Sequence, residues 1–544
     1  MCTLPLMSAL RAELNLVPLA FLWQRNQSSL LDEMVASGFV AILIKVAGIG
    51  LVERDLGKTL NQLQPKLEHL HSLYDAHVCG EGGEYETLSL DAPIFSHRVN
   101  VIATESVLHS DAAFASVSYL RILDAQLAEK NADEYGDQAV RRLIHAPPLM
   151  DPLSLAIAED ITQSCGSNER DSCIEVTPRT PSVRRTPTHI TISGISAHTT
   201  GSFIDEATAA FHVLQDTLSD CGLAFHDVSH VNIYLASAAD FASLNRVYST
   251  HFGVSPPSRV TVAVPMSGVR IVMDIVASHD DRRALRVQSR SYWAPASIGP
   301  YSQASKVGSR TTIAGQIGLV PATMQLVADP IEQAVLALQH TRRIVLATRE
   351  WNYSQREGYV EGGICWVSRD LHAVIANIWN AQPDVDETHA HHHLDDATWR
   401  GTAESPLLVV QVQPGGLPRD AAAEWQLTTN SGRTGDPEEE YKEPGGTERG
   451  TCIFNDVAVT YWMSSNCGAA IISRIEEGEQ GGDARKLVNA LDNASHVRQF
   501  HAGDALLERV CTPHALTNIP AHAWSLPGYT PTSSGSAVFW LAQL

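Results

Sequence analysis

The sequence predicts an α/β unit followed by two α+β modules, and three observations support this prediction. A nearly continuous apolar run at 40–47, preceded and followed by helical patterns, is typical of a strand covered on both faces. One order of strand, helix, strand, helix and strand occurs after residue 189 and again after residue 291. Between these parts, residues 161–188 are rich in Ser, Thr, Pro and Arg, which is typical of a flexible linker.

Length and composition narrow the choice of function. A chain of 544 residues is long enough for several hydrophobic cores. Its 39 Lys and Arg against 61 Asp and Glu give a formal net charge of −22, which argues against nucleic acid or an anionic membrane as a partner. No apolar run approaches the roughly 20 residues of a membrane helix, and no secretory signal pattern is present, so we expect a cytoplasmic protein. The 9 cysteines form no C-x-x-C pair and are expected to be reduced.

The predicted boundaries follow from these patterns. We expect the α/β unit at 1–160, the linker at 161–188, the first α+β module at 189–280 and the second at 291–544. The second module would contain two polar insertions, at 384–396 and 428–450, and the strand-like runs beyond residue 451 would complete its sheet. The first insertion carries a histidine cluster at 389–393, but adjacent histidines in a polar loop usually bind adventitious metal or none, so no metal site is predicted.

The stretch 78–88 is the strongest candidate for chemistry in the α/β unit. Three carboxylates, those of Glu81, Glu84 and Glu86, alternate there with three glycines. Glycine lets the backbone approach a ligand closely, and neighbouring carboxylates repel one another unless a cation lies among them. The other interpretation is a solvated acidic turn, as most short acidic clusters are. Tyr85 within the stretch adds an aromatic face that suits a cation.

Two basic residues of the α/β unit have open interpretations. Lys45, the one charged residue of the apolar strand, either points at an anion or extends to solvent from the strand end. Arg25 could bind a phosphate, or it could pair with Asp32 or Glu33. Cys79 has no neighbouring base in the sequence and is expected to be a buried structural thiol.

Four segments together carry a family resemblance: 18–25, 42–47, 56–60 and 79–88. They resemble the diphthine-ammonia ligase family, which is similar in fold to the HUP-type ATP-pyrophosphatases with their parallel sheet. The resemblance implies ATP-dependent amidation, with Mg²⁺, of diphthine on translation elongation factor two. The carboxylate would be activated as an acyl-adenylate and then attacked by ammonia. The substrate-binding residues that it implies are Glu81, Gly82, Gly83, Glu84, Tyr85, Glu86, Arg25 and Lys45, with Tyr85 against the trimethylammonium group.

The same resemblance raises a question about the nucleotide. ATP-pyrophosphatases bind the ATP phosphates with a Ser-Gly-Gly-x-Asp-Ser-type loop at a helix start near the N-terminus. This sequence has no such loop, and residues 1–17 resemble the end of the portion that would carry it. We therefore expect a chain truncated after the nucleotide site, so a catalytically inactive fragment is the alternative to an active ligase.

The repeated modules carry a second resemblance. Residues 298–304 and 315–318 resemble the opening of the RidA/YjgF family of trimeric imine deaminases, which have a chorismate-mutase-like fold. Asn245, Tyr248 and Arg259 match the later part of its pattern in the first copy. The residues that the resemblance implies for a pocket are Arg259, Asp274, Tyr301, Ser302 and Gln303, with Arg259 holding a substrate carboxylate as a bidentate partner.

Neither copy has a complete set of these residues. The first lacks the opening motif, and the second has Ser405-Pro406-Leu407 where the arginine should stand. The two copies could complete one pocket between them, or they could be structural modules that assemble as a trimer or pseudo-trimer. RidA-like ligand binding, imine deamination or an assembly role is therefore the second functional hypothesis.

Overall fold

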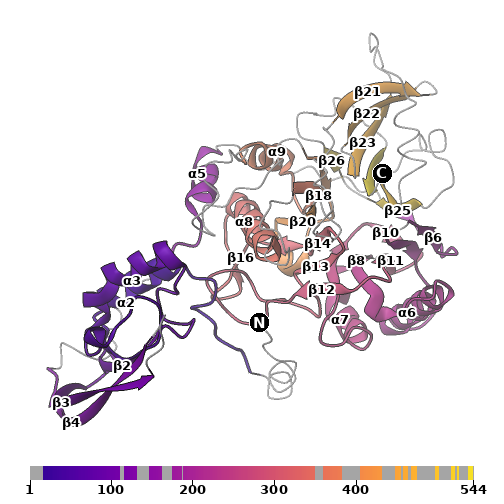
Figure 1. Ribbon diagram of the computed structural model, residues 1–544. Coiled ribbons are helices and arrows are strands. Elements are labelled where there is room, and N and C mark those ends of the chain that lie inside the picture. Colours follow the sequence, from indigo (N-terminus) through magenta and orange to yellow (C-terminus); the bar gives the residue numbers. More distant parts are fainter. Residues whose placement is uncertain are drawn as a thin grey trace. The chain divides into compact units, whose positions relative to one another are not determined.

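The computed structural model divides the chain into two compact units, residues 21–148 and residues 1–20 with 149–544 (Figure 1). Each is treated separately below. The structure describes residues 16–431, with gaps at 111–115, 132–145, 162–173, 187, 350–358 and 383–404. Residues 432–447 are not described, and beyond residue 447 only the strand residues are. Most of both predicted polar insertions and the histidine cluster lie outside the described residues.

The unit at 21–148 combines helices with one four-stranded sheet. Its elements are α2 (Gln27–Ala36), β1 (Val40–Val46), the 3-10 turn η1 (Glu53–Asp55), α3 (Leu60–Tyr74), β2 (Tyr85–Asp91), β3 (His97–Ser110) and β4 (Val117–Glu129). The strand order is β2-β1-β4-β3 and all three pairings are antiparallel. The predicted parallel sheet is therefore wrong for the described strands. A continuous apolar run indicates burial but not strand direction, and the apolar residues of β1 are buried against α2 and α3.

The first α+β module contains two helices and a five-stranded sheet. Its elements are β5 (Ile174–Glu175), β6 (Ser182–Arg185), β7 (Ile190–Ile195), α6 (Phe203–Asp220), η2 (Phe225–Asp227), β8 (Val228–Leu235), η3 (Ala238–Asp240), α7 (Phe241–Ser249), β9 (Ser258–Ala263), β10 (Met266–Ser267) and β11 (Ile271–Ala277). The order is β6-β7-β11-β8-β9, with β8 and β9 parallel. Because β6 lies within the predicted linker and pairs with β7, the module begins earlier than predicted.

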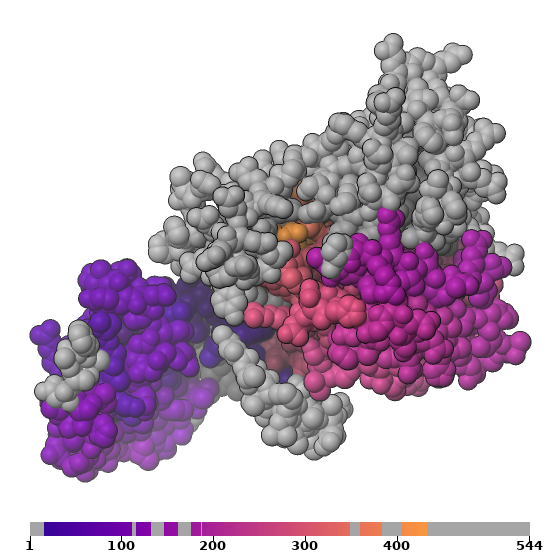
Figure 2. Space-filling model, turned by 45° about the vertical axis from the view of Figure 1, so that its right-hand side comes forward, coloured from indigo at the N-terminus to yellow at the C-terminus, as the bar shows by residue number. Residues whose placement is uncertain are grey.

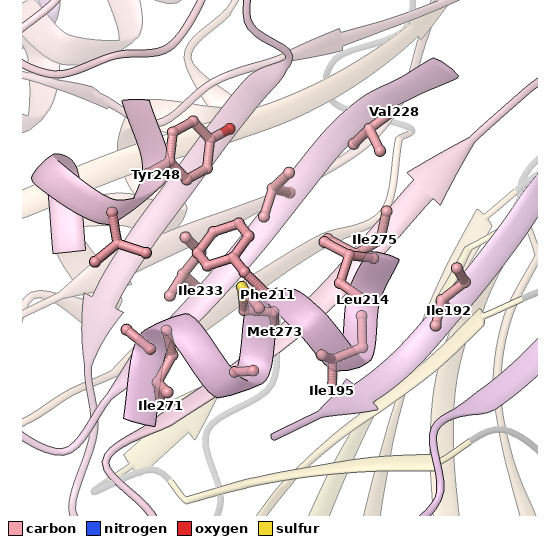
Figure 3. Packing of buried hydrophobic residues seen from close by; sticks show 14 of the residues in the cluster. Ile192, Ile195, Phe211, Leu214, Val228, Ile233, Tyr248, Ile271, Met273 and Ile275 are labelled. Carbon is pink, nitrogen blue, oxygen red and sulfur yellow. The ribbon is translucent and has the colours of Figure 1, made fainter. Parts of the chain in front are cut away.

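The helix α6 forms because its start and its apolar stripe are both encoded locally. Ser202 and Asp205 form a reciprocal capping box at its N-terminus. Phe211 and Leu214 then point from the helix onto the sheet, where they meet residues such as Ile233 and Met273 (Figure 3). The predicted amphipathic helix is confirmed, and it covers one face of the first sheet.

The second module repeats this plan. Its elements are β12 (Arg282–Leu285), β13 (Ala304–Val307), β14 (Arg310–Ile313), β15 (Gln316–Ile317), β16 (Leu319–Val320), β17 (Gln325–Leu326), α8 (Pro330–Arg349), β18 (Tyr359–Val367), α9 (His372–Asn380), β19 (Leu407–Gln411), η5 (Pro418–Asp420) and β20 (Ala423–Asn430). The sheet runs β12-β13-β14-β20-β18-β19, with β18 and β19 parallel. A short helix before the first module, α5 (Pro152–Asp160), contacts α8.

The two modules share one hydrophobic core. Val260 and Val262 of β9 pack in the same buried cluster as Trp366 of β18 and Val410 of β19. Tyr234 and Trp366 place their rings 6.2 Å apart across this junction. In the space-filling view the first module and the start of the second form a continuous surface (Figure 2). The faces of the two sheets that α6 and α8 leave uncovered are thus buried against each other.

The strands described beyond residue 447, except β26, form a sheet of their own. They are β21 (Glu448–Phe454), β22 (Val457–Met463), β23 (Cys467–Arg474), β24 (His496–His501), β25 (Leu516–Pro520), β26 (Ala523–Ser525) and β27 (Ala537–Ala542). Their order is β21-β22-β23-β27-β24-β25, with β24 and β25 parallel. The prediction that this section completes the second sheet is wrong for these strands, apart from β26, which pairs with β19. Alternating apolar runs predict strands but do not say which sheet they join.

A search of the described residues for membrane spans finds no helix with the length and hydropathy needed to cross a bilayer.

Candidate functional site

The acidic glycine stretch is a tight turn between α3 and β2. Gly80 and Gly83 have positive φ values of 77° and 92°, which a residue with a side chain adopts with difficulty. The Gly83 amide donates to the Gly80 carbonyl at 3.1 Å and closes the turn. The glycines are therefore required by the backbone path, whatever the turn binds.

Glu84 is the best-positioned carboxylate of this turn. Its Oε1 accepts a hydrogen bond from the His77 amide at 2.7 Å, while its Oε2 is buried and has no hydrogen-bond partner. A Cβ at Gly48 would lie 2.7 Å from the Glu84 Cβ, and one at Gly82 would lie 2.5 Å from its Oε1. Two glycines therefore make room for this side chain. An inward carboxylate oxygen without a partner favours a proton or a cationic donor.

The structure places Tyr85 beneath the turn rather than on its surface. The residue is 6% exposed, and its hydroxyl donates to the Val78 carbonyl at 2.7 Å. Burial, with the nearby Cys79 and Glu84, raises the pKa of the Tyr85 hydroxyl. The ring thus supports the turn, and its burial disfavours the predicted contact with a trimethylammonium group, which stays a prediction.

Cys79 is half-buried beside this ring. Its Sγ lies 3.4 Å from the Gln27 carbonyl, and burial together with the charge of Glu81 raises the pKa of the thiol. A raised pKa lowers the fraction of nucleophilic thiolate, which agrees with the predicted structural role.

The remaining predicted residues of this unit lie in ion pairs or in solvent. Lys45 of β1 donates to Glu86 of β2 at 2.7 Å across the strand pair, and both side chains are exposed. Arg25 pairs with Glu33, the second of the two alternatives for this side chain. Glu81 is exposed. The three carboxylates of the turn therefore face different partners and do not converge on one cation.

These contacts test whether the turn fits ATP with Mg²⁺. Its carboxylates would repel phosphates, and Lys45 and Arg25 are already paired with carboxylates. Lys58 and Lys66 both pair with the buried Asp55. Among the described residues, no group of three or more His, Cys, Asp or Glu is placed to hold a metal ion. The acidic turn therefore does not fit the nucleotide, and it suits a small cationic group at Glu84 instead.

A second candidate site lies between the two α+β modules. It is a cavity of about 340 Å³ lined from both of them. The first module contributes Ala238, Phe241, Ala242, Asn245, Arg259 and Thr261, and the second contributes Pro295, Ala296, Ile298, Tyr301, Gly315, Gln316, Ile317, Leu319, Pro418, Arg419 and Glu424. One of the two open alternatives, that the two copies complete one pocket between them, is compatible with this lining and stays a prediction.

Arg259 is the cationic group of the cavity. Its Nη2 donates to Asn245 at 2.8 Å, and its Nη1 is buried without a hydrogen-bond partner. Its guanidinium carbon lies 4.5 Å from the Tyr248 ring centroid and 5.4 Å from that of Tyr301, so two aromatic rings flank the charge. Burial lowers the pKa of Arg259, and a Cβ at Gly299 would lie 2.7 Å from its Nη2. The free Nη1 can donate to an acceptor in the cavity.

Glu424 of β20 is the acidic group on the opposite module. Burial raises its pKa to about 8, although the charge of Arg259 lowers it, so at neutral pH the carboxyl is mostly protonated. Its Oε2 is buried without a hydrogen-bond partner, as is the Thr261 hydroxyl nearby in the lining. The cavity therefore presents a fixed cation and a proton-bearing carboxyl to one small ligand.

Sequence reasoning found part of this cavity. Arg259 and Tyr301 line it, and their role in binding a ligand stays a prediction; the structure places the other three predicted residues elsewhere. Asp274 accepts from the Gly194 amide at 3.0 Å, Ser302 donates to the Pro256 carbonyl at 2.6 Å, and Gln303 accepts from the Val287 amide at 2.7 Å. All three are buried, and each is hydrogen-bonded to a backbone group outside the lining of the cavity.

Glu424 was missed by sequence reasoning. The signal that could have found it is that Glu424 directly follows three alanines, at 421–423, and is the one acidic residue of an otherwise uncharged strand-like run. A charged group in a buried strand requires a reason.

Together the fold and the two sites define a protein with an α/β part that carries an acidic turn, joined to repeated α+β modules. Residues 26–122 match the family described as Diphthamide synthase C-terminal domain, and residues 183–278 match Endoribonuclease L-PSP. The Diphthine--ammonia ligase of Schizosaccharomyces pombe is 37% identical over 430 residues, 77% of this chain and 66% of its own length. The chain belongs to the diphthine–ammonia ligase family.

Other relatives cover less of the chain. The Diphthine--ammonia ligase of Saccharomyces cerevisiae is 30% identical over 366 residues, 60% of this chain and 53% of its own length. The chain thus spans between half and two thirds of these fungal relatives. The solved structure of RidA from an Antarctic Psychrobacter is 26% identical, covers 25% of this chain and 94% of its own, and has a TM-score of 0.19.

Proposed function

We propose that the chain acts as a diphthine–ammonia ligase, joining ammonia to the carboxylate of diphthine on translation elongation factor two in the cytoplasm. The observation that carries the proposal is the similarity to a fungal enzyme of that name along 430 residues, supported by the separate family matches of residues 26–122 and 183–278. The net charge of −22 also suits a substrate that carries a quaternary ammonium group.

Amidation needs an activated carboxylate, and the family resemblance assigns that activation to ATP. The acidic turn does not fit ATP, so the part that we assign to it is recognition of the cationic reactants. The unpaired Oε2 of Glu84 would accept a hydrogen bond from ammonium, or face the quaternary nitrogen of diphthine. Gly48 and Gly82 leave the space that this carboxylate occupies, and Tyr85 supports the turn through its hydrogen bond to the Val78 carbonyl.

The test is amidation in a fungal strain whose own diphthine–ammonia ligase gene is deleted. Expression of the full chain should convert diphthine on elongation factor two to its amide, which mass spectrometry of the modified peptide detects. Persistence of the acid at normal expression would refute the proposal. Glu84→Gln keeps the acceptor for the His77 amide and removes the charge, so conversion should fall, whereas Glu105→Gln on the exposed face of β3 should not change it.

A second function rests on the cavity between the modules. We propose that it binds a small carboxylate or imine ligand, with Arg259 as the carboxylate partner and Glu424 as proton donor. Imine hydrolysis by the purified chain should be lost in Arg259→Ala and kept in Arg246→Ala, whose side chain contacts Ser243 on the surface. Equal activity of the first variant and the parent would refute this role.

A further inference from the structure

The strands beyond residue 447 repeat the sheet of the second module. The second sheet runs β12-β13-β14-β20-β18-β19 and the C-terminal sheet runs β21-β22-β23-β27-β24-β25. In both, the strand that comes last in the sequence lies fourth in the order, and the two outer strands after it are the parallel pair. The first sheet, β6-β7-β11-β8-β9, has the same order without the first strand. Three sheets of one topology therefore follow one another along the chain.

The contacts among these sheets also repeat. The parallel pair of the first module meets the second at β9 and β14. The parallel pair of the second meets the C-terminal sheet at β18 and β23. The parallel pair of the C-terminal sheet meets the first module at β25 and β7. In every case the partner strand holds the third place in the six-strand order, and β7 counts as third because the first sheet lacks the first strand. Each module therefore uses one surface towards the next module and another towards the previous one.

A further contact supports the same head-to-tail arrangement of the modules. The loop between β19 and β20 reaches back to the first module, where the Ala263 amide donates to the Gly416 carbonyl at 2.7 Å. In the C-terminal sheet the segment at the equivalent place, between β25 and β27, is β26, and it pairs with β19 of the second module. Head-to-tail contacts of this kind either close into a ring or continue into an open filament. Here the third contact returns to the first module, so the ring is closed.

We propose that the strands β21 to β27 belong to a third module which closes a three-module ring within one chain, so that the protein is a monomer with a single Arg259–Glu424 cavity. The other two junctions each lack one of the two charged groups. Leu407 occupies the Arg259 position at the junction of the second and third modules. In the first sheet Val272 pairs with Tyr234, and in the second sheet Glu424 pairs with Trp366 at the same place. Val272 therefore occupies the position of Glu424 at the remaining junction.

The proposal is tested by the mass of the full chain in solution. Light scattering after gel filtration should give the monomer mass of 59.1 kDa across a wide concentration range. A trimer, or any mass that rises with concentration, would overturn the proposal, because it would mean that module surfaces remain open to other copies.

A cross-link gives a second, independent readout on the full chain. The double variant Val410→Cys, Trp524→Cys places two thiols opposite each other in the pairing of β19 with β26. Mild oxidation should join them within one chain, seen as a linked peptide from a monomeric band, and Val410→Cys alone should give no such peptide. Chain-to-chain dimers from the double variant, or no link at all, would overturn ring closure at this junction.

Discussion

Gly315 is the residue whose replacement tests the geometry of the cavity most directly. It lines the cavity, and its amide donates to the Arg259 carbonyl at 3.2 Å. A Cβ at this position would overlap the Glu424 Oε1, its nearest neighbour, and would lie 2.5 Å from the Glu424 Cδ and 2.9 Å from its Cγ. Ordinary contacts begin at 3.4 Å, so the carboxyl group must move by at least 3.4 − 2.5 = 0.9 Å. Gly315→Ala should therefore displace Glu424.

The expected cost follows from the burial of Glu424. The residue is 3% exposed, so its carboxyl cannot move into solvent and must turn into the cavity or push β20 away. Overpacking of a buried site of this kind costs about 1–3 kcal/mol. The φ angle of Gly315 is not positive, so the alanine backbone itself adds no strain. Ligand binding in the cavity should weaken as well, because the displaced carboxyl occupies its space.

The assay is thermal unfolding of matched variants, with Gly253→Ala as the control. A Cβ at Gly253 meets no atom within 4 Å, so that variant should be neutral or more stable by about 0.4–1 kcal/mol. Gly315→Ala should lower Tm by several degrees, as 1–3 kcal/mol does in a unit of this size. Equal Tm values for Gly315→Ala and the parent would show that Glu424 is not held where the structure places it.

Three further predictions concern buried polar groups. Arg342→Ala should destabilise the protein by about 3–5 kcal/mol in chemical denaturation, because it leaves the buried Asp151 carboxylate without its ion pair. Between pH 4.5 and 8 the folded state keeps a proton on Glu424 that the unfolded chain releases. The free energy of unfolding should therefore fall with rising pH by about 1.4 kcal/mol per pH unit, and Glu424→Gln should remove this slope. Tyr85→Phe should cost about 0.5–1.5 kcal/mol in the α/β unit, because it removes the hydroxyl that donates to Val78.

Each of these has a comparison that isolates its cause. Arg121 forms an exposed ion pair with Glu105, so Arg121→Ala should destabilise the protein far less than Arg342→Ala, and an equal loss for the two variants would contradict the burial argument. A pH slope that persists in Glu424→Gln must come from another group. For Tyr85, unchanged protection of the 78–84 amides from hydrogen exchange in Tyr85→Phe would show that the hydroxyl does not hold the turn.

Sequence reasoning predicted the local features of this protein because local chemistry encodes them. The turn at 78–88 follows from its glycines, and α6 follows from its capping box and apolar spacing. The repeat of one strand and helix order along the chain was also visible without coordinates. Arg259 was found because its neighbours in the sequence form a recognisable pattern. In each case the information lies within about twenty residues of the feature itself.

Tertiary structure decided which residues meet. Arg259 and Glu424 lie 424 − 259 = 165 positions apart and line one cavity only because two modules pack against each other. Tyr85 alternates with acidic residues and suggested an exposed aromatic face, yet strand pleating turns its ring into the core. The direction of β1 and the sheet that the last strands join were equally undetermined. The apolar residues of a strand indicate that it is buried. Its partner strand and its direction depend on pairing with distant segments, which the sequence of the strand itself does not determine.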